Sequence, residues 1–337
     1  MMRTSPKIIV SILATLLIGS IIIPLITNFE NNIVNEILNN DENDSEELND
    51  AQKKALVDWE RNSTSDNFYL KQVGGIYNDY SYGIAISPNG IAYISGEFKD
   101  VVTLGDTTLT SMGNLDIFIA KLSETGEWLW AVSGGSVEDD RTRDITIDSN
   151  ENIYVTGSYG DTALFGSLAV LNDGESDIFV VKLNKDGVWN WVNTAGGIRD
   201  DVATSIDIDS NKNLFITGYF TGTASFDNLI LSSSGNEDIF VAKLASSNGA
   251  FRGVVSAGSS TGDDISNEII VDSNGSIYIA GSFEGTAFFG SNSITSEGHS
   301  DMFIAKLTDN GTVNGQLDLL WDWVKGVGDS YGDDEAK

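Results

Sequence analysis

The sequence predicts an all-β protein, a β-propeller built from four-stranded repeats of about 61 residues. The heptads DIFIAKL, DIFVVKL, DIFVAKL and DMFIAKL begin at positions 116, 177, 238 and 301, which is a nearly constant spacing. A second marker keeps the same phase, because Gly96, Gly157, Gly218 and Gly281 each stand at one fixed distance before the next heptad. Residues 66 to 337 show no sustained helical periodicity. Two markers in fixed phase indicate four copies of one unit.

Each unit alternates polar and apolar residues and is rich in β-branched and aromatic residues, as β-strands are. The second unit reads DITID, NIYVTGSY, DIFVVKL and VWNWVNTAGG, separated by Asn-, Asp- and Gly-containing turns. A short excursion, TALFGSLAVL, interrupts it between the second and third of these segments. Each unit is therefore predicted to contain four principal strands and a small extra hairpin.

A four-stranded unit that buries little surface alone must stack on its neighbours, and radial stacking protects the edges of its sheet. These requirements favour a propeller with one unit per blade. The alternative, an array of β-sandwiches, would not need the same Gly and Trp in every unit. The extra hairpin accounts for a period longer than the roughly 40–45 residues of WD40 repeats.

The chain contains four complete units and the start of a fifth, where Asp333 and Asp334 follow VKGVG. The segments FYLKQVGG at 68–75 and LLWDWVKG at 319–326 occupy the same position in the repeat, so they cannot complete one shared blade. This redundancy favours a fragment of a larger ring over a closed four-bladed propeller.

The N-terminal segment 1–29 is predicted to be a targeting element. Arg3 and Lys7 precede an apolar run from Ile8 to Thr27, and a helix rising about 1.5 Å per residue over this run is long enough to cross a membrane. An uncleaved signal anchor is favoured over a cleaved signal peptide, because the run is long and has no convincing cleavage site. The basic residues before the run place the downstream chain outside the cell. Residues 30–65, with ten acidic and three basic residues, are interpreted as a flexible acidic stalk, and residues 66–337 as the repeat array.

Composition excludes several classes of function. The chain has 19 Lys+Arg against 50 Asp+Glu, a net charge of −31, one His and no Cys. Nucleic acid is an improbable partner for such a charge. Thiolate zinc sites, iron–sulfur clusters and disulfide scaffolds require cysteine.

The combination of D-[IM]-F-[IV]-[AV]-K-L, W-x-W, Gly-Gly with Asp-Asp, D-S-N-x-N and [YF]-[IV]-[TAS]-G resembles the SBBP family over residues 66–337. This resemblance implies the seven-bladed β-propeller repeats of secreted and surface proteins of archaea and bacteria. It implies no particular activity, because the family is defined by its architecture.

A fainter likeness to quinoprotein-type propellers lies in a Gly turn followed by tryptophan. Phe251 takes the tryptophan position in the third unit. Such regular placement favours packing between blades over stacking on sugars or quinones. The predicted structural repeat residues are Trp128, Trp130, Trp189, Trp191, Trp321 and Trp323, with the heptad phenylalanines Phe118, Phe179, Phe240 and Phe303.

The turns DSNEN, DSNKN and DSNGS present alternating oxygen atoms that could hold Ca²⁺. The same residues are typical of Asx-turns that close a hairpin, and no bidentate Glu follows at the EF-hand distance. The turn interpretation is therefore favoured over a calcium site. The candidate ligands are Asp148, Asn150, Asn152, Asp209, Asn211, Asn213, Asp272 and Asn274.

Pairs of adjacent aspartates follow the Gly-Gly or Gly-Ser of each junction and would line one face of a propeller with carboxylates. They are a candidate binding face for cations or a basic partner, although solvated loops that cap the next strand are favoured. The pairs are Asp139 and Asp140, Asp200 and Asp201, and Asp263 and Asp264. The heptad lysines Lys121, Lys182, Lys243 and Lys306 could pair with acids of neighbouring blades, whereas His299 is expected to be solvated.

These observations favour a non-enzymatic propeller, at the cell surface or secreted, that acts as a binding or adhesion module for an unknown extracellular protein or glycan. No cofactor is expected, apart from the weaker possibility of calcium. A structural envelope spacer is the first alternative. The second is a hydrolase, lyase or quinone-dependent enzyme, which would need one blade to break the repeat with a unique polar cluster.

Overall fold

The computed structural model describes residues 73–313, 316–329 and 334. The chain divides into two units, residues 1–67 and 68–337, and all described residues belong to the second. The predicted signal anchor at 1–29 and acidic stalk at 30–65 lie outside the described residues. Within the described ranges, no helix has the length and apolar character that crossing a membrane requires.

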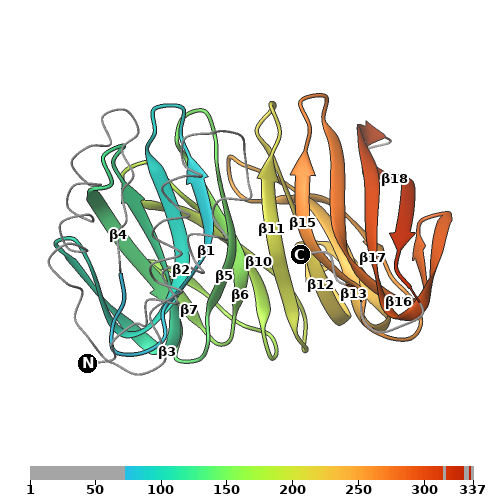
Figure 1. Cartoon of the computed structure of the whole chain (residues 1–337), viewed down its shortest axis with the longest axis horizontal. Helices are drawn as coiled ribbons and strands as arrows, with labels where there is room; N and C mark the ends of the chain where they lie inside the picture. Colours follow the sequence, from blue (N-terminus) through green and yellow to red (C-terminus); the bar gives the residue numbers. More distant parts are fainter. Residues whose placement is uncertain (1–72, 314–315, 330–333, 335–337) are drawn as a thin grey trace, which may run out of the picture. The chain divides into compact units, whose positions relative to one another are not determined.

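The repeat array consists of antiparallel sheets, which confirms the predicted all-β, propeller-type fold (Figure 1). The strands are β1 (Tyr80–Ile86), β2 (Ala92–Leu104), β3 (Thr107–Leu122) and β4 (Trp128–Gly135); β5 (Arg141–Ile147), β6 (Ile153–Tyr159), β7 (Ala163–Phe165), β8 (Leu168–Val170), β9 (Asp177–Leu183) and β10 (Trp189–Ala195); β11 (Asp201–Ile208), β12 (Asn213–Phe226), β13 (Leu229–Ala245) and β14 (Phe251–Ala257); and β15 (Ile265–Val271), β16 (Ser276–Phe289), β17 (Asn292–Val313) and β18 (Gln316–Val327).

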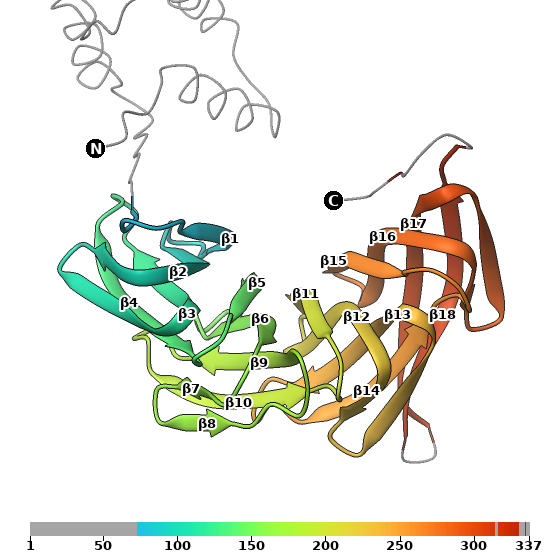
Figure 2. The ribbon, with the colours of Figure 1, turned by 90° about the horizontal axis from the view of Figure 1, so that it is seen from below.

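Each repeat supplies four neighbouring strands in chain order, with β5, β6, β9 and β10 forming the second set. The first strands of the sheets, β1, β5, β11 and β15, follow one another along one side of the array (Figure 2). Figure 2 also shows the first and last sheets at opposite ends of this series.

The extra hairpin predicted in the second repeat joins two sheets. It is formed by β7 and β8, and β7 pairs with β4 of the preceding sheet through Gly134–Phe165 and Gly135–Leu164. In the next two repeats the equivalent hairpin extends the two middle strands, and the bridges Gly196–Ser225 and Gly258–Phe288 connect it to the preceding repeat. The hairpin therefore ties each sheet to the one before it.

The hydrophobic core lies between consecutive sheets. Phe215, Ile239 and Val241 of the third sheet, for example, share one buried cluster with Ile269 and Ile279 of the fourth. The alternation of each strand places one set of apolar residues toward the preceding sheet and the other toward the following sheet. The four heptad phenylalanines, Phe118, Phe179, Phe240 and Phe303, are all buried.

The two tryptophans of each pair make different packing contacts. The first Trp of each pair, Trp128, Trp189 or Trp321, lies against the hairpin glycine of its own repeat, Gly105, Gly166 or Gly290. In the third repeat Phe251 takes this place and meets Phe226 edge-on at 5.2 Å. The likeness to docking tryptophans is therefore restricted to the second Trp.

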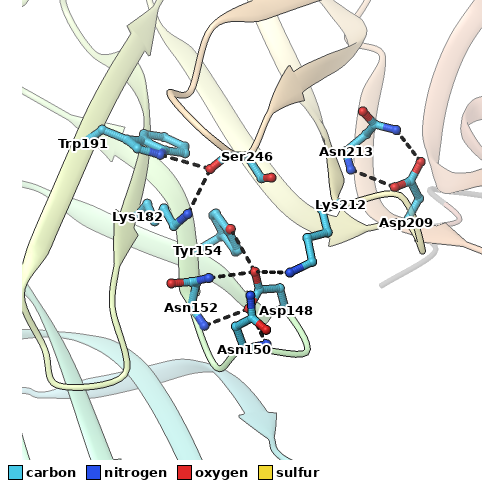
Figure 3. Close-up of polar contacts among 10 residues, drawn as sticks. All are labelled: Asp148, Asn150, Asn152, Tyr154, Lys182, Trp191, Asp209, Lys212, Asn213 and Ser246. Atoms are coloured by element: carbon cyan, nitrogen blue, oxygen red, sulfur yellow. Dashed lines mark hydrogen bonds and ion pairs between the residues drawn. The ribbon is translucent and has the colours of Figure 1, made fainter.

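Trp130 and Trp191 dock onto the next blade, as predicted. Trp191 Nε1 and Lys182 Nζ both donate to the carbonyl of Ser246, at 3.2 and 3.1 Å (Figure 3). Trp130 and Lys121 donate in the same way to the carbonyl of Lys185. The turn glycine Gly249 has φ of +74° and would bring a Cβ to 2.7 Å from the Trp191 ring. This lysine–tryptophan clamp recurs at the first two junctions between blades.

The heptad lysines meet acids less regularly than the sequence suggested. Lys121 lies 3.6 Å from Glu151 of the next repeat, and Lys243 pairs with Asp309 of the next repeat. Lys306 instead pairs with Asp322 of its own sheet at 3.6 Å. His299 is 73% exposed at its side chain, as expected, and contacts Glu284 at 3.0 Å.

The last sheet repeats the geometry of a junction. The amide of Asp334 donates to the carbonyl of Ser300 at 2.7 Å, as the amides of Asp140, Asp201 and Asp264 do to Leu115, Ser176 and Glu237. Asp334 therefore occupies the position from which β5, β11 and β15 begin in the other repeats.

Candidate functional site

Every first strand carries a β-bulge opposite the marker glycine. The register shifts between Thr142 and Asp144 in β5, so that Arg143 is the extra residue opposite Gly157. A Cβ on Gly157 would collide with the carbonyl of Arg141, which explains why glycine recurs at this position. β-Bulges re-aim side chains and are common beside binding sites. The bulged residue is Tyr82, Arg143, Thr204 and Asn267 in the four sheets.

The four repeats carry four different residue types at this bulged position, which belongs to none of the repeated motifs of the sequence. Its distance from the marker glycine that follows is the same in every unit, so aligning the four repeats on that glycine shows one Tyr, one Arg, one Thr and one Asn. Arg141, two positions earlier, likewise corresponds to Tyr80, Val202 and Ile265. Divergence at a fixed structural position is the signal that could have revealed the site.

A cavity of about 870 Å³ opens beside this position and is lined by residues of the first three repeats. Arg141, Arg143, Ser158, Val202 and Tyr219 line it, all at positions where the repeats diverge. Six carboxylates share the lining, from Glu138, Asp139, Asp161, Asp173, Glu175 and Asp200. The cavity therefore places two guanidinium groups within a predominantly acidic surface.

The two arginines have different environments. Arg141 pairs with Asp139, with Nη2 at 3.0 Å from Oδ2. Arg143 instead lies over the ring of Tyr82, with its guanidinium carbon 5.4 Å from the ring centre, and forms no ion pair within the described part of the chain. An arginine that faces a cavity without a carboxylate partner is suited to bind an anionic or carbonyl group of a ligand.

Tyr82 connects Arg143 to a buried carboxyl group. Its hydroxyl donates to Glu97 Oε1 at 3.0 Å, while Oε2 of Glu97 is buried without a hydrogen-bond partner. Burial raises the pKa of Glu97. In the other repeats this position holds Ser158, Tyr219 and Ser282, so a carboxyl group here is specific to the first repeat.

Exposed aromatic residues adjoin the cavity. Tyr77, Tyr80 and Tyr82 are 52%, 46% and 42% exposed, and Lys99 lies 6.0 Å from the ring centre of Tyr77. Asn114 and Asp139 belong both to this region and to the cavity lining. Tyrosine and arginine are enriched among the residues that contribute most of the binding energy in protein interfaces.

The aspartate pairs of the candidate binding face are split by the structure. The first members, Asp139, Asp200 and Asp263, reach solvent, and Asp139 and Asp200 line the cavity. The second members, Asp140, Asp201 and Asp264, are completely buried and so do not belong to an exposed face. Successive residues at the start of a strand point in opposite directions, and the second side chain enters the junction between sheets.

Each buried aspartate caps the glycine-containing loop before it. Asp201 Oδ2 accepts from the amide of Gly197 at 2.7 Å, and Asp264 Oδ2 accepts from the amide of Ser259 at 2.6 Å. A Cβ on Gly196 would contact both Asp201 and the heptad Asp177, so these two carboxyl groups face each other. Burial raises the pKa of Asp201 to about 7 and that of Asp177 to about 6, and Asp140 with Asp116 repeats this arrangement at the preceding junction.

The Asx-turns hold donors around their carboxylates. Asp148 Oδ1 accepts from the amides of Asn150 and Asn152 at 2.8 and 2.9 Å, and Oδ2 accepts from the side chain of Asn152 at 2.8 Å (Figure 3). Lys212 of the next repeat lies 3.5 Å from Oδ2. Burial opposes ionisation, but the hydrogen bonds from Asn152 and Asn150 outweigh it and lower the pKa of Asp148. Asp209 with Asn213, and Asp272 with Asn274, form the corresponding turns.

This geometry favours the turn over a calcium site, because amide donors occupy the directions from which a cation would approach Asp148. Among the residues that the structure describes, no group of three or more His, Cys, Asp or Glu is arranged to hold a metal. Asn211, the remaining candidate ligand, is exposed on the second of these turns. Calcium binding at these turns remains a prediction to be tested.

We expect Asp148→Ala to lower the free energy of unfolding by about 2 kcal/mol, equally with and without 1 mM CaCl₂, because several amide donors lose a charged acceptor. Denaturant unfolding in CaCl₂ and in EDTA measures this. If CaCl₂ stabilises the wild-type chain and this gain disappears in Asp148→Ala, the turn is a calcium site instead.

Comparisons with known proteins agree with the repeat architecture. The family model described as SBBP, a beta-propeller repeat, matches residues 134–158, which run from the end of β4 through β6. An uncharacterized WD repeat-containing protein of Acanthamoeba polyphaga mimivirus is 31% identical over 138 residues. That alignment covers 37% of this chain and 10% of the viral protein, so the chain matches only a small part of its relative.

Proposed function

We propose that this chain, which carries SBBP β-propeller repeats, is a non-enzymatic interaction scaffold that holds a basic segment of a partner protein. The observation that carries the proposal is the cavity beside Arg143. Its lining combines six carboxylates with residues that differ from one repeat to the next. A surface selected only for packing would repeat from blade to blade, as the clamp and the heptads do.

Charge complementarity favours a basic protein segment over a glycan as the partner. The chain has a net charge of −31, and the exposed carboxylates Asp161 and Asp200 stand at the cavity. Such a field attracts cationic segments and accelerates their association. The exposed tyrosines beside the cavity would add apolar contact area, as they do at the centres of protein interfaces.

The scaffold is proposed to work outside the cell, attached through residues 1–29 or secreted after their removal. This part of the proposal depends on the sequence of the N-terminal segment. No metal or organic cofactor is required by the proposed role. A purely structural spacer, the alternative drawn from the sequence, would not require a cavity lined by residues that differ from repeat to repeat.

We expect the full chain to bind a dodecameric Lys-rich peptide and not its Glu-rich counterpart. The double substitution Asp161→Asn with Asp200→Asn should weaken binding about two- to thirtyfold at 50 mM salt, because exposed ion pairs contribute about 0.2–1 kcal/mol each. Fluorescence anisotropy of labelled peptide measures the dissociation constants. The control is Asp186→Asn, an equally exposed carboxylate on the turn between β9 and β10, outside the cavity.

Two results would contradict the proposal. If no basic peptide binds at 50 mM salt, the cavity is not a site for basic segments. If Asp186→Asn weakens binding as much as the double substitution, the attraction comes from the net charge of the chain and not from the cavity. Turnover in a hydrolase or lyase substrate screen would support the enzymatic alternative, and glycan-array binding would support a carbohydrate partner.

A further inference from the structure

Arg143 is the feature of the cavity that the proposed attraction of basic segments does not explain. A cavity meant only for cations would be expected to contain no unpaired cation. Arg143 lines the cavity and forms no ion pair within the described residues, although six carboxylates share the lining. The neighbouring Arg141, by contrast, is neutralised by Asp139 at 3.0 Å.

The position of Arg143 is fixed by two contacts that leave its hydrogen-bond donors available. The bulge in β5 turns the side chain out of the regular alternation of the strand. The guanidinium carbon lies 5.4 Å from the centre of the Tyr82 ring, and the hydroxyl of Tyr82 donates to Glu97 at 3.0 Å. A guanidinium has five N–H donors, and contact with an aromatic ring does not use them.

Glu97 does not line the cavity, but it belongs to the buried support on which Tyr82 and Arg143 rest. It is 2% exposed, and its Oε2 has no hydrogen-bond partner. Burial raises its pKa, while the charges of Arg141 and Arg143 act in the opposite direction, so the carboxyl group lies in their field.

We infer that the partner segment carries one acidic side chain, which pairs with Arg143, flanked by basic residues that meet the carboxylates at the rim of the cavity. This inference rests on the proposed function and adds a specificity to it. The ion pair between Arg143 and the acidic side chain would fix the register of the segment. The carboxylates at the rim would attract its basic residues and accelerate association. A segment with basic residues alone would place a cation against Arg143.

The test compares two dodecameric peptides that differ at one position. Both are Lys-rich, and the central residue is Glu in one and Gln in the other. The full wild-type chain should bind the Glu peptide about tenfold more tightly than the Gln peptide, because a charge-assisted hydrogen bond contributes about 1.5–3 kcal/mol. Arg143→Ala should abolish this preference and leave the affinity for the Gln peptide unchanged or increased, since the like charge has gone.

Two further variants keep the test falsifiable. Arg143→Lys should retain part of the preference, because the positive charge remains while the planar donor geometry is lost. Arg252→Ala removes an exposed arginine of β14 outside the cavity and should retain all of it. Thermal melting of each variant establishes that it is folded.

The inference is overturned if the wild-type chain binds both peptides equally, or if Arg143→Ala keeps the preference for Glu. The proposed function survives both of those results, since basic segments would still bind. If neither peptide binds, the proposed function fails, and this inference fails with it.

Discussion

Replacing Trp191 with alanine should lower the free energy of unfolding by about 3–5 kcal/mol, the largest effect expected of any single substitution considered for this chain. The indole packs 6.2 Å from the ring of Tyr154 and lies against Gly249 of the next blade. Its Nε1 also donates to the carbonyl of Ser246 at 3.2 Å. Truncation removes both contacts and opens a cavity at the junction of the second and third sheets.

Urea unfolding followed by circular dichroism measures this change, and two matched variants separate its causes. Trp191→Phe keeps an aromatic ring but loses the hydrogen bond to Ser246. Loss of this hydrogen bond should lower the free energy of unfolding by about 1 kcal/mol, in addition to the effect of packing a smaller ring at this position. Val188→Ala alters an exposed side chain on the preceding turn and should stay within about 0.5 kcal/mol of wild type.

The loss should be confined to one junction. In arrays of repeats, each unit contacts only its neighbours, so stability is a sum over units and junctions. Hydrogen exchange should therefore accelerate at the 245–250 turn, where the amide of Gly249 donates to the carbonyl of Ala245, and remain slow in β15–β18. Equal acceleration in all four sheets would contradict the assignment of Trp191 to a local clamp.

Acidification from pH 8 to pH 5 should stabilise the folded chain. Burial raises the pKa of Asp140 and Asp201 to about 7 and that of Asp116, Asp177 and Asp264 to about 6. Between about pH 4 and pH 7 the folded chain therefore binds more protons than the unfolded chain. The free energy of unfolding must fall as the pH rises through this window.

A net gain of about 3 kcal/mol on acidification would raise the melting temperature by about 6–12 °C for a domain of this size. Differential scanning calorimetry between pH 4 and pH 9 measures the shift. Below pH 4 stability should decrease again, because the pKa of Asp148 is lowered in the folded state and protonation removes its hydrogen bonds. A maximum near pH 4 is expected, where these two effects meet.

Relief of repulsion among the 50 acidic residues would change stability in the same direction, so the experiment needs a control. Asp200→Asn and Asp201→Asn remove one charge each at adjacent positions, the first exposed and the second buried. Only Asp201→Asn should flatten the pH dependence and stabilise the chain at pH 8. Its amide could donate to Asp177 Oδ1, which lacks a partner.

Equal effects of the two substitutions would show that general repulsion, not burial, causes the pH dependence. Sodium chloride at 0.5 M gives a second criterion, since it screens exposed charges far more than buried ones. The difference between pH 5 and pH 8 should therefore survive high salt in the wild-type chain.

The periodic features of the fold could be predicted because they are local. Alternation within DIFVVKL and the Asp, Asn and Gly turns predict strands and hairpins from neighbouring residues alone, and the structure confirms them. Both tryptophans of each pair were interpreted as contacts between blades; this was correct for Trp130 and Trp191, whereas the first Trp of each pair packs on a glycine of its own repeat. The extra hairpin was predicted, but not its pairing with the preceding sheet.

The candidate site was only partly predictable. The acidic face was expected, yet half of its residues, including Asp140 and Asp201, proved to be buried. Arg143 was missed because a search for repeated motifs favours positions that agree, and this position differs in all four repeats. A comparison of the repeats at the bulge would have found it.

The sequence by itself determined the repeat, its period, its strands and the acidic character of its surface, because these follow from the order of residues along one strand or turn. The tertiary structure alone decided which of two adjacent aspartates lies between the sheets. It also decided which carbonyl Trp191 and Lys182 share, and that Arg143 lines an acidic cavity without an ion pair to any residue the structure describes. These facts depend on stacking one sheet against the next, which brings together side chains a whole repeat apart in the sequence and excludes water from between them.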